Sequence, residues 1–211
     1  MDRFTYYRMG LKSLEEIKKS GKKPTLLMHV CCAPCLAFPI TYLIDYFDVT
    51  LFFNNSNIAP LEEYQKRLET FETYIGYVNK RYNSNVKWIV TPYAVEEFQA
   101  KLLEFDDHKE GGKRCYYCCS TRMNEAYAYA SKNNYDYFTT IMTSSRQKDS
   151  DMLNGIGKVL QEKYPNTKYL FSDFKKGQQI DKSVEICKDL NLYRQNCCGC
   201  RYSKTKYEKD R

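Results

Sequence analysis

This 211-residue sequence lacks the features that would place it in a membrane or in the secretory pathway. No stretch approaches the roughly 18 consecutive apolar residues of a membrane-spanning helix. The first residues contain no apolar core followed by a small-residue cleavage site. We therefore expect a cytoplasmic protein with no membrane partner. In a reducing compartment, clustered cysteines bind metals or carry out redox chemistry more often than they form structural disulfides.

Two enzyme motifs are also absent. The first expected strand is followed by Cys-Cys-Ala-Pro at 31–34, and not by a glycine-rich, serine-containing phosphate loop, so ATP use is disfavoured. No Cys-x3-Cys-x2-Cys block is present, which argues against radical S-adenosylmethionine chemistry. The two absences argue against an ATP-dependent enzyme and against a radical S-adenosylmethionine enzyme.

No internal repeat, low-complexity linker or change of composition divides the chain, so we expect one α/β domain over residues 1–211. Within it we predict a helical extension at 1–23, a metal-binding catalytic core at 24–203 and a basic tail at 204–211. The net charge of +7 is too small to prove nucleic-acid binding. The segment 201–211 interleaves cations with tyrosines, which suits contact with phosphates and bases but equally suits a solvated tail.

Cysteines gather in three tight groups. These groups are Cys31, Cys32 and Cys35; Cys115, Cys118 and Cys119; and Cys197, Cys198 and Cys200. Thiolates held at such spacings repel one another and oxidise easily. We therefore expect the groups to fold together around a soft metal centre.

Short apolar runs alternate with longer helical patterns along the chain, which predicts a series of βαβ units. The expected strands are Thr25–Val30, Val49–Phe53, Val86–Val90, Tyr135–Met142 and Lys168–Phe171. The expected helices are a short opening helix with a capping box at Ser13 and Glu16, then Leu36–Phe47, Leu61–Arg81, Ala94–Phe105, Ser120–Lys132 and Ser150–Tyr164. We predict an open, mainly parallel sheet of about five strands with helices on both faces, a Rossmann-like α/β fold.

Ligands of open α/β sheets bind beyond the carboxyl ends of the strands. In this chain Cys31 and Cys32 follow the first strand, 54–57 follow the second, and 143–146 follow the fourth. The group at 115–119 is expected on a loop entering a helix, where backbone N–H groups favour thiolate over thiol. The sequence therefore predicts a metal site at the carboxyl ends of the strands.

The first two cysteine groups fit more than one chemistry. Cys-Ala-Pro-Cys at 32–35, at a helix start, imitates a thioredoxin-type dithiol. Together with Cys31, however, the separated pair Cys115 and Cys118 completes the four thiolates that a four-iron cluster requires. Structural zinc also takes four thiolates, but the spacing here is far longer than in ordinary zinc ribbons, which makes zinc the second choice.

The third group is of a different kind. A disulfide between Cys198 and Cys200 would close a cramped ring that needs the backbone freedom of Gly199, so it would be strained and easily reduced. That favours a redox pair over a structural bridge. Cys187 lies on an amphipathic stretch and is expected to be a buried apolar residue. The roles of Cys119 and Cys197 stay open.

Five blocks of the sequence resemble, in the same order, those of the QueH-type epoxyqueuosine reductases. The blocks are 29–35, 54–60 with Glu63, Tyr64 and Arg67, 113–118 with Arg122 and Met123, 138–140, and 195–200. The match runs from about Leu26 to Ser203, and five blocks in the order of the family are specific in combination. The resemblance implies the last step of queuosine synthesis. In that step two electrons remove the epoxide oxygen from epoxyqueuosine at the wobble position of tRNA, without cobalamin.

The resemblance also implies which cysteines hold the cofactor. Its cluster ligands correspond to Cys31, Cys32, Cys115 and Cys118, which would bind a four-iron four-sulfur (4Fe-4S) cluster. Its redox-active disulfide corresponds to Cys198 and Cys200. Cys35 matches a position near a separate iron, where the family varies between cysteine and an acidic residue.

The expected partners are tRNA that contains epoxyqueuosine and an electron donor that the sequence does not identify. Candidates for holding the nucleoside are Asn54, Asn57, Thr143 and Arg146, although the two asparagines also suit turns. An extruded base of the single-stranded anticodon loop could reach a deep site.

Two rival functions remain at this point. One is a tRNA sulfur-transfer enzyme with an iron–sulfur site, although the missing phosphate loop disfavours it. The other is a non-enzymatic RNA-binding module stabilised by zinc, which would be colourless and redox-silent. His29 lies inside a buried strand pattern and is expected to be a hydrogen-bonded core residue rather than a ligand.

Overall fold

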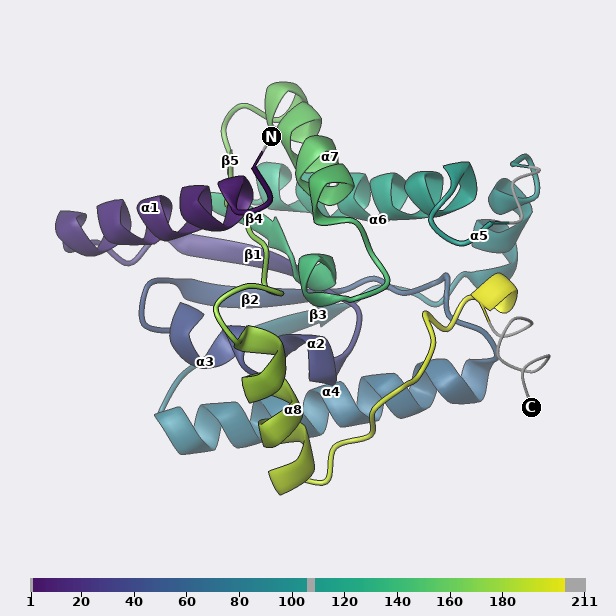
Figure 1. The fold of residues 1–211 in the computed structure, drawn as a ribbon, viewed down its shortest axis with the longest axis horizontal. Helices are drawn as coiled ribbons and strands as arrows, with labels where there is room; N and C mark the ends of the chain where they lie inside the picture. The colour runs from purple at the N-terminus through teal and green to yellow at the C-terminus, as the bar shows by residue number, and fades with distance from the viewer. Residues whose placement is uncertain (1, 106–108, 204–211) are drawn as a thin grey trace.

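A five-stranded parallel sheet forms the centre of the molecule (Figure 1). In the computed structural model, which describes residues 2–105 and 109–203, the strand order is β3-β2-β1-β4-β5 and each neighbouring pair is parallel. The strands are β1 (Thr25–Val30), β2 (Asp48–Phe53), β3 (Lys87–Val90), β4 (Tyr137–Thr140) and β5 (Lys168–Tyr169). The predicted α/β fold class is confirmed. The basic tail expected at 204–211 lies outside the described residues.

Helices cover both faces of this sheet. They are α1 (Thr5–Ser20), α2 (Ala33–Leu36), α3 (Pro39–Leu43), α4 (Leu61–Tyr82), α5 (Val95–Leu102), α6 (Lys113–Lys132), α7 (Ser150–Lys163) and α8 (Gln179–Asp189), with a 3-10 helix η1 (Ile141–Ser144). Side chains of α2, α3, α4 and α8 share one core, and those of α6 and α7 form a second core on the other side of the sheet (Figure 1). None of the helices within 2–105 and 109–203 has the length and apolarity to cross a membrane.

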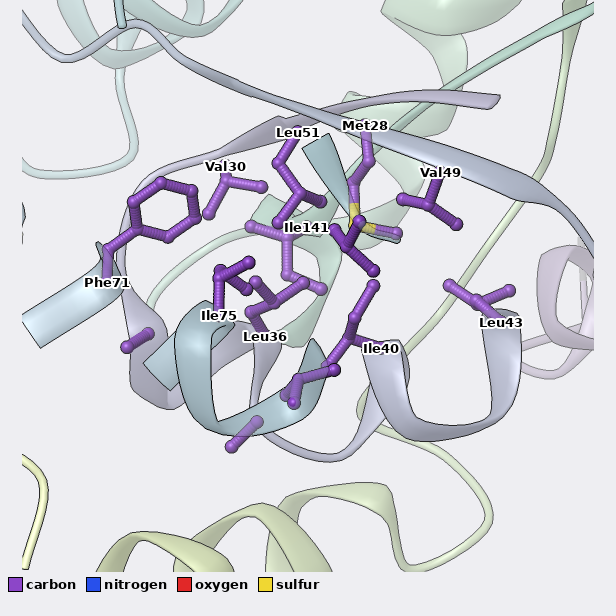
Figure 2. Close-up of a cluster of buried hydrophobic side chains, with 14 of the residues drawn as sticks. Met28, Val30, Leu36, Ile40, Leu43, Val49, Leu51, Phe71, Ile75 and Ile141 are labelled. Carbon is purple, nitrogen blue, oxygen red and sulfur yellow. The ribbon is translucent and has the colours of Figure 1, made fainter. Parts of the chain in front are cut away.

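Strand β1 is buried on both faces because it lies in the middle of the sheet. Its side chains alternate, with Leu26, Met28 and Val30 in the first core and Leu27 in the second. Figure 2 shows the first core, where Met28 and Val30 lie with side chains of β2 and the helices, among them Val49, Leu51, Leu36, Ile40 and Phe71. A central parallel strand covered on both faces explains the continuous apolar run in the sequence.

The parallel register brings three strand ends to one edge of the sheet. Val30 at the end of β1 pairs with Phe53 at the end of β2, and His29 pairs with Thr140 at the end of β4. The three segments that follow these strands therefore leave the sheet side by side. Cys31, the first residue after β1, lies at the middle of this edge.

The predicted single helix over 36–47 is wrong, because the helical segment is divided between α2 and α3, and α3 ends at Leu43. α2 ends at Leu36, and α3 begins at Pro39. Proline has no N–H group for an intrahelical bond and favours the first position of a new helix. The N–H of Phe38 donates to the hydroxyl of Ser183 in α8 at 3.1 Å, so the break is held by a contact with another helix.

The capping box expected at Ser13 and Glu16 is also wrong. Helix α1 begins at Thr5, so both residues lie in its middle. The residue before the helix, Phe4, gives no side-chain hydrogen bond to the first turn. Packing explains why the helix forms without such a cap, since Leu14 and Ile17 are buried in the first core.

The strand expected over 135–142 is shorter than predicted, because its last residues turn into η1. The hydroxyl of Thr140 accepts a hydrogen bond from the N–H of Met142 at 3.2 Å and so starts the 3-10 turn. This turn directs the chain after β4 across the carboxyl edge of the sheet.

A pair of glycines in α7 tests the packing between this helix and β5. A Cβ atom at Gly157 would overlap the ring of Tyr169, whereas a Cβ atom at Gly155 meets nothing within 4 Å. Gly157→Ala should lower the free energy of unfolding by about 1–3 kcal/mol through overpacking. Gly155→Ala should raise it by up to about 1 kcal/mol, because alanine favours helix. Urea unfolding followed by circular dichroism measures both changes, and equal midpoints for the two variants would contradict the packing.

A cysteine-rich candidate metal and redox site

Three thiols gather where β1 passes into α2. The Sγ atom of Cys32 lies 3.7 Å from that of Cys31 and 2.8 Å from that of Cys35, and all three sulfurs fall within 4.8 Å of one another. Cys32 has an extended backbone conformation at the residue before α2. Hydrogen bonds from Cys32 and Cys35 to Cys31 hold the pKa of the Cys31 thiol well below its usual range. Soft thiol donors this close together can bind a metal ion.

The second cysteine group lies inside a helix, and its predicted place on a loop is wrong. Helix α6 begins at Lys113, so Cys115 and Cys118 stand three residues apart on one side of its first turns. The Sγ atom of Cys115 accepts the N–H of Gly111 at 3.3 Å. Burial raises the pKa of Cys118 to about 12, so a metal at this thiol would have to displace a proton. Neither cysteine belongs to the group of three sulfurs within 4.8 Å.

One buried arginine of α6 holds the ends of β1 and β2 together. The Nε atom of Arg122 donates to the carbonyl oxygen of Asn54 at 3.0 Å, and Nη2 donates to Oδ1 of Asn55 at 2.5 Å. The same Nη2 lies 3.2 Å from Nε2 of His29, whose Nδ1 lies 3.0 Å from the Thr140 hydroxyl. Burial and the neighbouring guanidinium lower the pKa of His29 to about 3. His29 is thus a neutral, hydrogen-bonded core residue, as expected.

The same guanidinium faces thiols from two cysteine groups. Arg122 is 1% exposed, and within residues 2–105 and 109–203 no carboxylate forms an ion pair with it at 4.0 Å or less. Burial opposes its charge, but the nearby sulfurs of Cys118 and Cys31, when ionised, raise the pKa of Arg122 above its ordinary value. An unpaired buried cation is costly. The arrangement therefore favours negative charge on the sulfurs around it.

A second buried arginine anchors the loop that carries the third cysteine group. Arg67 of α4 donates from Nη1 to the carbonyl oxygen of Cys198 at 3.0 Å and from Nη2 to that of Cys197 at 3.2 Å. Glu63, one helical turn earlier, pairs with the guanidinium at 2.7 Å and accepts the hydroxyl of Tyr193 at 2.8 Å. Charged, multiply bonded contacts of this kind fix position as well as adding energy. They hold the loop against the other two cysteine groups.

The thiols of Cys198 and Cys200 are hydrogen-bonded to each other, and neither forms a disulfide in the structure. The hydrogen bond from Cys200 holds the pKa of Cys198 well below its usual range, and the ammonium of Lys148 contributes to the same shift. The pKa of Cys200 is raised, first by that hydrogen bond and then by burial. One sulfur is therefore set up as thiolate and its partner as thiol.

The remaining cysteines pack without such contacts. Cys187 of α8 is 2% exposed in the first core, which confirms its expected apolar role. Cys119 of α6 is equally buried, in the second core. Cys197 is half-buried and gives its carbonyl oxygen to Arg67.

A cavity of about 230 Å³ opens beside these groups. Its walls come from the segments after β1, β2 and β4, from α8 and from the loop of the third cysteine group. Cysteines and cations dominate the polar lining, namely Cys31, Cys35, Cys197, Cys198, Arg67, Arg122, Arg146, Lys148 and Arg194. No aspartate or glutamate of the described residues lines it. The cavity is therefore suited to a ligand that carries negative charge.

Two of the residues predicted to hold a nucleoside lie behind the cavity wall. Asn54 is 4% exposed, and its Nδ2 donates to Glu125 at 2.6 Å. Thr143 is fully buried, and its hydroxyl lies 2.9 Å from that of Ser172. Neither side chain lines the cavity. Both support the strand ends that shape it.

The other two predicted nucleoside residues do line the cavity. Arg146 is exposed at the rim, where it lies 4.0 Å from the carboxylate of Asp181. Asn57 is 2% exposed, and its Oδ1 has no hydrogen-bond partner. Such an orphaned acceptor at a cavity wall suits a ligand that donates a hydrogen bond.

Comparison with known proteins identifies the family. A family model described as "Epoxyqueuosine reductase QueH" matches residues 26–206. Relatives that carry the same name include one from Staphylococcus aureus, 35% identical over 95% of this chain and 84% of the relative. Another from Streptococcus pyogenes is 34% identical over 95% of this chain and 78% of the relative, and one from Thermotoga maritima is 37% identical over 85% and 90%. The chain belongs to the QueH family.

Membership of the QueH family confirms the expected family, and because its relatives are named as reductases it also confirms the expected enzyme class, an oxidoreductase. The sequence analysis predicted no contact for three cations of the site, although Arg67 and Arg122 belong to the blocks that resemble the family. Arg67 and Arg122 each lie on the buried face of a helix, with apolar residues three or four positions away. A charged residue on an otherwise apolar helix face is a sequence pattern that could have identified both as site residues. Lys148 lies in a polar loop and carries no such signal.

Gly199 tests how the third cysteine group is held. Its φ is +90°, and a Cβ atom there would lie 2.6 Å from Nη2 of Arg67. Gly199→Ala should therefore displace the loop and speed tryptic cleavage after Arg194. Gly21 is the control, because it also has positive φ, +65°, but open space around it. Gly21→Ala should weaken folding by about 1 kcal/mol and leave cleavage after Arg194 unchanged. Equal digestion of the two variants would contradict the anchoring contact.

Proposed function

We propose that this chain is an epoxyqueuosine reductase that removes the epoxide oxygen from epoxyqueuosine at the wobble position of tRNA and yields queuosine. The observation that carries the proposal is the convergence of thiols from three chain segments on Arg122 and Lys148 beside one cationic cavity. The relatives named epoxyqueuosine reductase QueH supply the substrate. Ten free thiols suit the reducing cytoplasm, where we place the reaction.

The donor set fits an iron–sulfur cofactor. Cys31, Cys32, Cys115 and Cys118 would hold a 4Fe-4S cluster, and Cys35 would approach a second iron beside it. Thiolate ligands favour iron–sulfur clusters over hard cations. An anionic thiolate centre would also balance the buried charge of Arg122, which has no carboxylate partner in residues 2–105 and 109–203. When bound, such a centre supplies single electrons, and a ferrous ion beside it supplies a Lewis acid for the epoxide oxygen.

The Cys198 and Cys200 pair fits the electron count of the reaction. Removing the epoxide oxygen breaks two C–O bonds, forms one C=C bond and releases water, which consumes two electrons and two protons. Joining the Cys198 thiolate and the Cys200 thiol in one disulfide releases two electrons and one proton. The pair therefore supplies both electrons of one turnover, water supplies the second proton, and an external dithiol reductant would restore the pair. Its carbonyl contacts with Arg67 keep the pair beside the cavity.

The cavity wall suits the anticodon loop of a tRNA. Arg146 and Arg194 stand at the exposed rim, where phosphates of the loop would meet them. Asn57 offers an unpaired acceptor to a base N–H or a sugar hydroxyl of an extruded nucleoside. In this proposal Asn54 and Thr143 do not touch the nucleoside, and their hydrogen bonds fix the segments after β2 and β4 that form the cavity wall.

Metal content and turnover test the proposal together. Protein purified without oxygen should contain about four or more irons with matching sulfide per chain and should convert epoxyqueuosine in tRNA to queuosine, as nucleoside mass spectrometry would show. Zinc without sulfide, together with no conversion, would contradict the proposal and favour an RNA-binding module stabilised by zinc.

Cysteine variants separate the two proposed roles. Cys31→Ser and Cys115→Ser should lose iron and activity together. Cys198→Ala and Cys200→Ala should keep the iron but slow conversion by about 100-fold or more, since each removes a source of protons and electrons. Cys187→Ala, in the first core, is the control and should keep both properties. Wild-type turnover in Cys198→Ala and Cys200→Ala with full iron would show that the pair has no part in the reaction.

A further inference from the structure

Lys148 is a half-buried cation whose side chain contacts the third cysteine group. It lies on the loop between η1 and α7, it lines the cavity, and its Nζ donates to the Sγ atom of Cys198 at 3.4 Å. Within residues 2–105 and 109–203, no carboxylate forms an ion pair with it at 4.0 Å or less. The thiolate of Cys198 is the main reason that the pKa of Lys148 lies well above its usual range.

A neighbouring lysine shows that this contact is specific to Lys148. Lys175 donates from Nζ to the backbone oxygen of Lys148 at 2.9 Å and to the hydroxyl of Ser150, and its charge lies 3.9 Å from the carboxylate of Asp173. Lys175 thus has an acidic partner and ties down the loop. Lys148 is held in place by this contact, and within residues 2–105 and 109–203 its negative partner is the sulfur of Cys198.

We propose that Lys148 is a positioning residue of the reductase. Its ammonium holds Cys198 as the thiolate of the Cys198 and Cys200 pair and favours the reduced pair over the disulfide. The use of the pair in catalysis rests on the proposed function. The contact of 3.4 Å between Lys148 and Cys198 does not depend on that function.

Lys148 favours the reduced pair because the charge of the pair changes when the disulfide forms. When the disulfide forms, both sulfurs are oxidised, two electrons leave, Cys200 releases its proton, and the negative charge facing Lys148 disappears. A dithiol reductant reverses each of these changes. Lys148 therefore stabilises only the reduced pair, and a pair whose reduced form is stabilised is a stronger oxidant. The disulfide should in consequence be reduced readily after each turnover.

Several titratable groups face these two side chains. From α6 they are Cys118, Cys119 and Arg122, from β1 and the residue after it they are His29 and Cys31, and from the third cysteine group Cys200 faces Cys198. Arg122 lowers the pKa of Cys198 as Lys148 does, so removing Lys148 should weaken the thiolate without abolishing it.

The pH dependence of alkylation tests the ion pair. Reduced, full-length protein is treated with iodoacetamide between pH 5.5 and 9.5, and each peptide is quantified by mass spectrometry. Cys198 should react with a midpoint below the ordinary thiol pKa of about 8.5. Lys148→Gln should raise that midpoint by roughly 1 unit or more, and Lys148→Arg should leave it near the wild-type value. Lys158→Gln, which removes an exposed cation of α7, should not move it.

Cys187 serves as an internal reporter of folding in the same experiment, because it is buried in the first core and should stay unmodified. An unchanged Cys198 midpoint in Lys148→Gln, with Cys187 protected, would overturn the proposal. If Cys187 reacts in Lys148→Gln, the folded Lys148→Arg variant decides the matter, since a midpoint at or above about 8.5 there would also overturn it.

A redox titration tests the second part. Equilibration with glutathione buffers should give about tenfold more disulfide relative to dithiol in Lys148→Gln than in wild type for each unit by which the Cys198 midpoint rises. An equal ratio in both proteins would overturn the claim that Lys148 favours the reduced pair. Neither measurement requires turnover, so a failure to convert epoxyqueuosine would count against the proposed function and leave the test of Lys148 intact.

Discussion

The position and charge of the cysteine site depend on the buried guanidinium of Arg122. It binds the carbonyl oxygen of Asn54 and the amide oxygen of Asn55, so it joins helix α6 to the carboxyl end of the sheet. Since no carboxylate in residues 2–105 and 109–203 pairs with it, its charge must be balanced by the thiols that face it from both sides. A buried cation left unbalanced would destabilise the fold by several kcal/mol. Fold stability and a thiolate-rich centre are therefore linked.

The parallel sheet and two further cations complete the arrangement. Register alone places the segments after β1, β2 and β4 at one edge, but the third cysteine group comes from the far end of the chain and has no strand to position it. Arg67 fixes its backbone and Lys148 faces its thiolate. Three cations from three elements thus define where negative sulfur can lie, and the same cations give the cavity its charge.

Much of this fold follows from the sequence, because central parallel strands must be apolar throughout and are easily recognised. The errors have local causes. Pro39 lacks the N–H that would continue α2 and begins α3, and the hydroxyl of Thr140 ends β4 by accepting the N–H of Met142. Helix α6 begins earlier than expected because packing, including Arg114 at 3.6 Å from the ring of Tyr202, stabilises a cysteine- and tyrosine-rich turn of modest helix propensity. Lys148 could not be found, since its partner Cys198 lies fifty residues away.

The central claim is that one anionic iron–sulfur centre joins the turn after β1 to helix α6 beside Arg122. Iron-edge anomalous diffraction from crystals grown without oxygen tests this claim most directly. The account predicts a cluster of irons bound jointly by Cys31, Cys32, Cys115 and Cys118. A single zinc ion held by Cys31, Cys32 and Cys35, with Cys115 and Cys118 left free, would contradict it.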